Sequence, residues 1–346
     1  MTYFWNSSVM VGESILPIRA DDRTATANRL LFPAKQILSV TSSSGRVTYA
    51  PDQDYVFTPG SRVLTIPEGS AIPVRTRRDF TVPKGSQPYH IARRDGAGEI
   101  LLGMTHEYAD MQVLVTYSHS SEGWTVTPPC FAEKQLPNAI RKLTDGEPIT
   151  VTLFGDSISA GYNASEFVQA EPYQPPYGEL LIQHLQSSYR SKITFANPSV
   201  SGQTSGWGVN NIAPIASAKP DLVILAWGMN DGCGGCPAAH FVANLTAQIA
   251  AVQQVNPFAE FILVSSMLPN RDWASANPDL VLRYRDAVLK LAGQGIAVAD
   301  LTSVWETMLK TKDYLDFTGN GVNHPNDFGH RIYAQIISAL LIREPN

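Results

Sequence analysis

The stretch ITVTLFGDSISAG, residues 149–161, decides how the rest of the chain is interpreted. Its first part, residues 149–154, is rich in β-branched and aromatic side chains and is typical of a buried strand that ends in a small, polar turn. Ser157 therefore stands where a strand passes into a helix. Ligands of an open parallel sheet bind beyond the carboxyl ends of its strands, so this serine is placed for chemistry. The alternative is that Asp156 and Ser157 only cap the next helix.

Strand-like and helix-like segments alternate from this stretch to the C-terminus. The strand-like segments are ITVTLF, ITFANP, LVILAWG, FILVSSM and IAVADL, and the helical ones are YGELLIQHLQSSYR, AAHFVANLTAQIAAVQQV, DLVLRYRDAVLKLAG and FGHRIYAQIISALL. This alternation implies right-handed crossovers and a parallel sheet with helices on both faces. We therefore expect an α/β domain over residues 149–346.

The N-terminal part follows a different pattern. Residues 1–121 contain short β-like segments, such as RVLTIP and MQVLVTYSH, separated by Gly, Pro, Asp and Ser. This spacing predicts a β-sandwich, jelly-roll-like domain. Residues 122–148 are rich in proline and polar residues without a sustained period, which indicates a surface linker. The histidines of the N-terminal part, His90, His106 and His119, lack ligand spacing, so packing or surface roles are favoured over metal binding.

Composition and charge limit the function classes. The 346 residues allow two domains, and the net charge of -5 comes without a run of Lys or Arg, which argues against nucleic acid as a partner. We expect no membrane contact, because no stretch reaches the roughly 18 consecutive apolar residues of a membrane helix. The first residues also lack the basic start and apolar core of an export signal. We expect no cofactor and no metal, while compartment and oligomeric state stay open.

Four residues lie at or just beyond predicted strand ends: Ser157 in GDSIS, Gly202 in NPSVSGQT, Asn230 in AWGMND and His324 in GVNHPND. In this order the four blocks resemble those of the SGNH branch of the GDSL esterases and lipases, which is named after Ser, Gly, Asn and His. The resemblance covers residues 150–341 and implies a flavodoxin-like, three-layer α/β/α domain. Each residue alone has an ordinary explanation as a turn or loop residue, but the four in family order favour an esterase.

The resemblance also implies a role for each residue. Ser157 would be the nucleophile and His324 its general base, because a serine hydroxyl needs an adjacent base and histidine has the pKa nearest neutrality. The backbone N–H groups of Ser157 and Gly202 and the side-chain amide of Asn230 would form the oxyanion hole.

The implied substrate is a small-molecule or oligosaccharide ester. Two-domain carbohydrate esterases with a β-sandwich ahead of the SGNH domain are similar in organisation, which points to short acyl groups, above all acetyl, on a carbohydrate. The alternatives are a lipase or thioesterase with the same site, distinguished by a preference for longer acyl chains, and a non-catalytic carbohydrate-binding protein.

One position departs from the family pattern. The family usually has an aspartate three residues before the histidine, and this chain has Gly321 there. A backbone carbonyl, Asn323 or Asp316 could hold the Nδ1 proton of His324 instead, and we favour a Ser-His dyad. The missing acid is the argument for the non-catalytic alternative.

Two further features have open interpretations. The CGGC sequence at residues 233–236, with His240 nearby, could be a redox motif or a zinc site, but a local disulfide or two free thiols are favoured because the ligand set is incomplete. Tyr173, Tyr177 and Trp207 could form a platform for a sugar ring or could pack the loop onto the domain.

Overall fold

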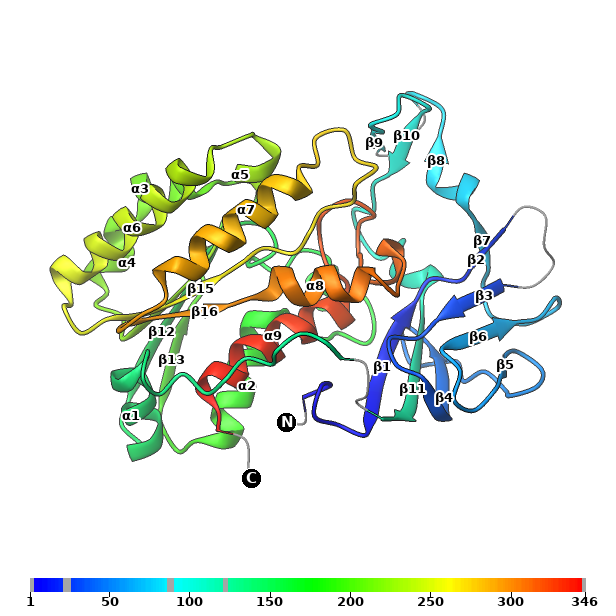
Figure 1. Ribbon diagram of the computed structural model, residues 1–346, viewed down its shortest axis with the longest axis horizontal. Helices are drawn as coiled ribbons and strands as arrows, with labels where there is room; N and C mark the ends of the chain where they lie inside the picture. Colours follow the sequence, from blue (N-terminus) through cyan, green and yellow to red (C-terminus); the bar gives the residue numbers. More distant parts are fainter. Residues whose placement is uncertain (1–2, 21–25, 86–89, 121–123, 344–346) are drawn as a thin grey trace.

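A computed structural model describes residues 3–20, 26–85, 90–120 and 124–343. Figure 1 shows two parts side by side, one with helices around a parallel sheet and one built mainly of short strands. In the described ranges, no helix combines the length and the apolar character that crossing a membrane requires.

Five parallel strands form the central sheet of the C-terminal part. Their order is β13 (Ile193–Ala196), β12 (Ile149–Gly155), β14 (Leu222–Ala226), β15 (Glu260–Val264) and β16 (Ile296–Ala299). Numbered along the chain this order is 2-1-3-4-5, the flavodoxin-like arrangement. Its switch point lies between β12 and β14, so the carboxyl ends of these two strands are the expected place for a ligand.

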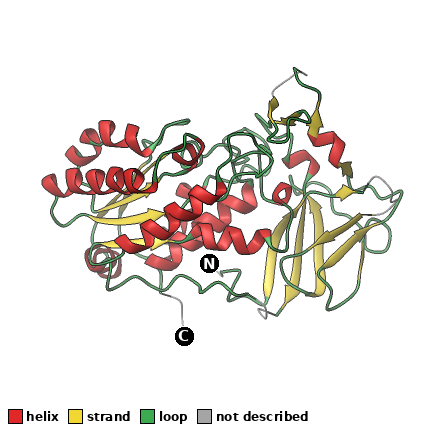
Figure 2. Ribbon diagram, turned by 45° about the horizontal axis from the view of Figure 1, so that its top comes forward, coloured by secondary structure: helices red, strands yellow, loops and turns green. Residues whose placement is uncertain are grey.

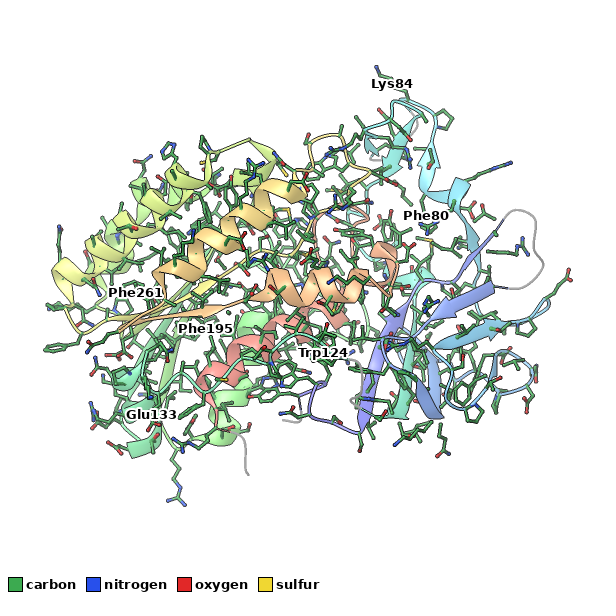
Figure 3. All side chains as sticks on the ribbon, in the orientation of Figure 1. Phe80, Lys84, Trp124, Glu133, Phe195 and Phe261 are labelled. Carbon is green, nitrogen blue, oxygen red and sulfur yellow. The ribbon has the colours of Figure 1, made fainter. Side chains whose placement is uncertain are left out.

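Helices cover both faces of this sheet (Figure 2). Successive strand residues point to opposite faces, so on β14 Leu222 and Ile224 join one buried cluster while Val223 and Leu225 join another. Phe261 of β15, labelled in Figure 3, belongs to the second cluster. The first face packs against α1 (Pro137–Asp145), α2 (Tyr177–Ser188), α8 (Leu301–Leu309) and α9 (Asp327–Leu341), and the second against α3 (Ser205–Asn211), α4 (Ala213–Ser217), α6 (Ala238–Val255) and α7 (Pro278–Val288). A short helix, α5 (Met229–Cys233), follows β14. The predicted three-layer α/β fold is confirmed.

Antiparallel strands predominate in the N-terminal part, as predicted. One sheet has the order β1 (Val9–Ile15), β11 (Val113–His119), β4 (Ala34–Ser42), and a second has the order β3 (Thr26–Arg29), β6 (Val63–Ile66), β5 (Val56–Phe57). A third contains β8 (Thr81–Val82), β10 (Glu99–Leu101) and β9 (His90–Ala92), while β2 (Ile18–Arg19) and β7 (Arg75–Thr76) pair in parallel. Val115 of β11 and Leu64 of β6 belong to the same buried cluster, which also extends into the C-terminal part.

A buried ionic group joins the two parts. The ammonium of Lys312, whose side chain is fully buried, lies 2.7 Å from the Glu13 carboxylate on β1 and 3.3 Å from Asp316 in the 3-10 helix η4 (Tyr314–Asp316). It also donates to the carbonyl oxygen of Ser14 at 2.9 Å. Removing one member of such a group leaves an uncompensated buried charge, so these contacts hold β1 against the C-terminal part.

The segment predicted as a linker, residues 122–148, contains helix α1. Its first-turn N–H groups have no partners within the helix, and those of Asn138 and Ala139 donate to the Glu260 carboxylate on β15 at 2.9 and 2.8 Å. The helix was missed because this partner lies about 120 positions away in the sequence. The exact domain boundaries stay a prediction.

Candidate active site

Strand β12 ends in the turn that carries Ser157. Gly155, its last residue, has no space for a side chain, because a Cβ there would collide with the carbonyl oxygen of Ala226 on β14. The turn is closed by the Asp156 carboxylate, which accepts a hydrogen bond from the N–H of Ile158 at 3.0 Å. Ser157 is only 4% exposed. Its position at the switch point of the sheet is therefore set by close backbone packing.

His324 lies in the loop before α9, and its Nε2 is 2.8 Å from Ser157 Oγ. The loop folds around the side chain of Asn320, whose Oδ1 accepts from the N–H groups of Val322, Asn323 and His324 at 2.9, 2.9 and 3.0 Å. The structure thus brings together the two residues that the sequence predicts as nucleophile and base.

The second ring nitrogen of His324 contacts Asn163. Nδ1 lies 2.8 Å from the Asn163 Oδ1. The amide nitrogen of Asn163 donates to the carbonyl oxygens of Gly319 at 3.2 Å and Thr105 at 3.3 Å. Because this nitrogen faces two acceptors, the amide oxygen faces the ring, and Nδ1 carries the ring proton. Nε2 is then free to accept the hydroxyl proton of Ser157.

None of the partners suggested for Nδ1 by the sequence holds it. The partner is a side chain, not a backbone carbonyl. Asn323 instead accepts from a neighbouring asparagine at 2.9 Å, and Asp316 pairs with Lys312. The dyad favoured from the sequence lacks an acid and leaves Nδ1 to a backbone carbonyl or to a nearby amide such as Asn323. In the structure an amide does contact Nδ1, but it belongs to Asn163.

Asn163 was missed by sequence reasoning. It lies six residues after Ser157 and has a φ of 63°, in the left-handed region that asparagine adopts more readily than most residues. An asparagine in a turn could have indicated this conformation. Nothing in the sequence indicates that its amide meets a ring 161 positions further on.

The other two predicted residues lie on loops beside the nucleophile turn. Gly202 follows β13 and has a φ of 76°, which favours glycine. Its loop is tied to β12, because the N–H of Val200 donates to the carbonyl oxygen of Gly155 at 3.1 Å. Asn230 follows β14 and uses its amide nitrogen to donate to the carbonyl oxygen of Gln203 at 2.8 Å. One N–H of that amide remains for another acceptor.

Backbone donors are available in the same loops. In the part of the chain that the structure describes, the N–H groups of Ser157 and Gly202 have no hydrogen-bond acceptor. The loops are also fixed to each other, because the Asp231 carboxylate accepts from the backbone N–H of Ser205 at 3.0 Å and from its hydroxyl at 2.5 Å.

Burial dominates the electrostatics of the site. It lowers the pKa of His324 to about 3, to which repulsion by His330 adds. Burial also raises the pKa of the Asp156 carboxyl to about 7. Among the described residues, no carboxylate forms a hydrogen bond with the His324 ring. The imidazole is therefore neutral at pH 7, which is the form that a general base requires.

Two aromatic rings stand beside His324. The Tyr162 ring lies 5.5 Å from the His324 ring in an edge-on arrangement, and Phe167 packs on Tyr162 at 4.5 Å. Phe167 is 43% exposed. This pair therefore offers apolar surface on the histidine side of the nucleophile.

The aromatic residues that the sequence suggested as a platform do not act together. Tyr177 is buried, and its hydroxyl bonds to that of Ser159 at 2.7 Å. Trp207 packs against Phe154 at 5.8 Å, whereas Tyr173 is 53% exposed. The packing interpretation holds for Tyr177 and Trp207.

Cys233 and Cys236 are free thiols rather than a disulfide. Burial raises the pKa of Cys233 to about 12, with the charge of Asp156 adding to it, so this thiol is not activated. Within the described ranges, no cluster of three or more His, Cys, Asp or Glu could hold a metal ion.

The C-terminal part matches the family model described as "GDSL-like Lipase/Acylhydrolase family" over residues 153–332. An arylesterase from Vibrio mimicus is 32% identical over 102 residues, which are 29% of this chain and 47% of the arylesterase, so the chain spans about half the length of that relative.

The solved structures that are similar to this chain at a low level include two esterases. One, a two-domain esterase active on acetylated mannans and co-crystallized with mannopentaose, gives a TM-score of 0.48 at 21% identity, covering 62% of this chain and 54% of that chain. The other, an acetylxylan esterase from Geobacillus stearothermophilus, gives a TM-score of 0.46 at 17% identity, covering 58% of this chain and 99% of that chain.

Proposed function

The chain belongs to the GDSL-like lipase/acylhydrolase family, and from this premise we propose that it is a serine esterase that removes short acyl groups, above all acetyl, from a carbohydrate or a similar polar alcohol. The observation that carries the proposal is the 2.8 Å contact between Ser157 Oγ and His324 Nε2, with Nδ1 of the same ring held by Asn163. Nucleophile, base and orienting group are the parts that acyl transfer through serine requires.

The reaction follows from this arrangement. Ser157 Oγ attacks the ester carbonyl carbon while its proton passes to His324 Nε2, which forms a tetrahedral intermediate and an imidazolium ion. His324 then gives the proton to the departing alcohol oxygen as the bond from that oxygen to the acyl carbon breaks. A water molecule, deprotonated by the same nitrogen, hydrolyses the acyl-serine and restores both residues.

We assign the oxyanion hole to the N–H groups of Ser157 and Gly202 and to the side-chain amide of Asn230. The first two have no other acceptor in the described structure, and the amide of Asn230 retains one N–H. Such donors act on the negative charge that develops on the carbonyl oxygen, and each typically contributes roughly a hundredfold to a thousandfold to turnover.

The substrate assignment rests on two arguments. The acetyl and carbohydrate parts follow from the resemblance to two-domain carbohydrate esterases. The departing alcohol must lie on the side of His324, because that ring protonates it, and there Tyr162 and Phe167 offer aromatic surface. Aromatic rings with a polar edge suit ligands that are partly apolar, such as the faces of sugar rings.

Two alternative functions would give different results in the assays described below. A lipase or thioesterase would use the same residues on longer acyl chains. A non-catalytic carbohydrate-binding protein is favoured by the lack of an acid at position 321, whereas the contact of Asn163 with the His324 ring supports a catalytic role for that ring.

The test compares p-nitrophenyl acetate with p-nitrophenyl octanoate, followed by a panel of acetylated oligosaccharides assayed for released acetate. We expect faster turnover of the acetate, acetate release from at least one oligosaccharide, and fluorophosphonate labelling of the wild type but not of Ser157→Ala. Preference for octanoate would replace the proposal with the lipase assignment. Absence of both turnover and labelling would leave only the binding function.

A further inference from the structure

The position where the family usually carries its acid is occupied by another part of this chain. Gly321 has a φ of 81°, a conformation that favours glycine. A Cβ at Gly321 would collide with the hydroxyl of Tyr108 and would lie 2.9 Å from the carbonyl oxygen of Leu101. An aspartate therefore cannot stand at position 321 while residues 101–108 remain in place.

Residues 101–108, which we call the positioning segment, are themselves held tightly. Tyr108 is fully buried, and its hydroxyl donates to the carbonyl oxygen of Leu101 at 2.8 Å. The N–H of Gly103 donates to the carbonyl oxygen of Asn320 at 3.1 Å. A Cβ at Gly103 would lie 2.8 Å from Tyr108 Cδ2 and 2.9 Å from the carbonyl oxygen of Gly319, so glycine allows this close approach to the histidine loop.

The same segment contacts the residue that orients His324. The carbonyl oxygen of Thr105 accepts from the amide nitrogen of Asn163 at 3.3 Å, and that of Gly103 lies 3.5 Å from the same nitrogen. Together with Gly319 these acceptors decide which end of the amide faces the ring. The positioning segment, which excludes an aspartate at position 321, thus supplies two of the three carbonyl oxygens that face the amide nitrogen of Asn163.

We propose that the positioning segment, from the N-terminal part of the chain, sets the orientation of Asn163 and through it the tautomer of His324, in place of an acid at position 321. The inference rests on the proposed esterase function. It assigns the N-terminal part a role in turnover, because β10 leads into this segment, β11 follows it after a short 3-10 helix (Ala109–Met111), and the Lys312 group anchors β1 to the C-terminal part.

The test is a double-mutant cycle on the full chain with p-nitrophenyl acetate. Gly103→Ala pushes the segment away from Gly319, and displacements of about 1 Å in a catalytic site can cost about a hundredfold in rate. We expect kcat to fall at least about tenfold with KM within about twofold. In the Asn163→Ala background the same substitution should change kcat by less than about twofold, because coupled residues are not additive.

Gly293→Ala is the matched control, because a Cβ there meets nothing within 4 Å. It should leave kcat unchanged. The proposal is overturned if Gly103→Ala keeps wild-type kcat, or if its loss adds in full to that of Asn163→Ala. Should Gly103→Ala not fold, Tyr108→Phe enters the same cycle, since it removes the hydroxyl and keeps the ring.

A second measurement does not depend on turnover. The nitrogen-15 shifts of His324 report which ring nitrogen carries the proton. We expect the proton on Nδ1 in the wild type and a mixture of tautomers in Gly103→Ala and Asn163→Ala. If both variants keep the wild-type tautomer, the proposal is contradicted even when the enzyme is active. If the wild type has the expected tautomer but no turnover, only the esterase assignment is contradicted.

Discussion

Replacing Asn163 with alanine tests whether its amide orients the His324 ring or only supports the fold. The substitution leaves the Nδ1–H of His324 without its acceptor at 2.8 Å, in a site where burial already lowers the pKa of the ring. An unsatisfied buried donor costs about 1–3 kcal/mol. At about 1.36 kcal/mol for each tenfold change in rate, kcat should fall about 5- to 150-fold. Replacing the aspartate of a catalytic triad with asparagine costs more, roughly 10⁴-fold, because the histidine is then held in the wrong tautomer and its imidazolium form loses the carboxylate charge.

The assay is steady-state hydrolysis of p-nitrophenyl acetate, with kcat and KM determined separately. KM should change by less than about twofold, because Asn163 acts on the ring and not on the substrate. Asn138→Ala on helix α1 removes an amide far from the site in the fold and serves as the control. A kcat for Asn163→Ala within about twofold of the wild type, in a folded protein, would refute the orienting role.

Three further predictions follow from the structure. Because burial lowers the pKa of His324 to about 3, the base stays neutral in mild acid. The acidic limb of the kcat/KM profile against pH should therefore lie below pH 6. An apparent pKa of about 6–7 for that limb, near the ordinary value of histidine, would contradict the prediction. Lys312→Met leaves the buried Glu13 carboxylate without a countercharge, which should lower the free energy of unfolding at pH 7 by about 3–5 kcal/mol in urea titrations. Lys290→Met, at an exposed lysine, should change it little. Asn230→Ala should lower kcat by roughly a hundredfold to a thousandfold without a change in the circular dichroism spectrum, and unchanged turnover would remove Asn230 from the oxyanion hole.

The fold of the C-terminal part was predictable because its signals are local. Each buried strand is a short apolar run, and the helices between them carry their own periodicity, so a parallel sheet with helices on both faces follows from general rules of chain connection. The flavodoxin-like arrangement, which has the strand order 2-1-3-4-5, was implied only by the family resemblance. The contact of Ser157 with His324 was predictable from the order of the family blocks. Helix α1 was missed because the acceptor for its first turn is a carboxylate on a distant strand.

The orienting group was not predictable for a different reason. The sequence shows that the acid at position 321 is absent, but it does not show what fills its place. The answer depends on Tyr108, which belongs to the other part of the chain and is brought to Gly321 by tertiary packing. A residue whose role depends on three backbone carbonyls from two separate loops leaves no pattern of its own in a single sequence.

The chemistry of those carbonyls explains why an amide stands at position 163. Its side chain faces the carbonyl oxygens of Gly103, Thr105 and Gly319, and an ionised carboxylate there would meet three acceptors with nothing to donate. Asparagine donates to the carbonyls and accepts from His324 at once. The consequence is that, among the residues that the structure describes, no carboxylate bonded to the His324 ring balances the imidazolium formed during turnover. The charge on the tetrahedral oxygen, held by the oxyanion donors, is then the main countercharge for that ring, so the two halves of the site depend on each other.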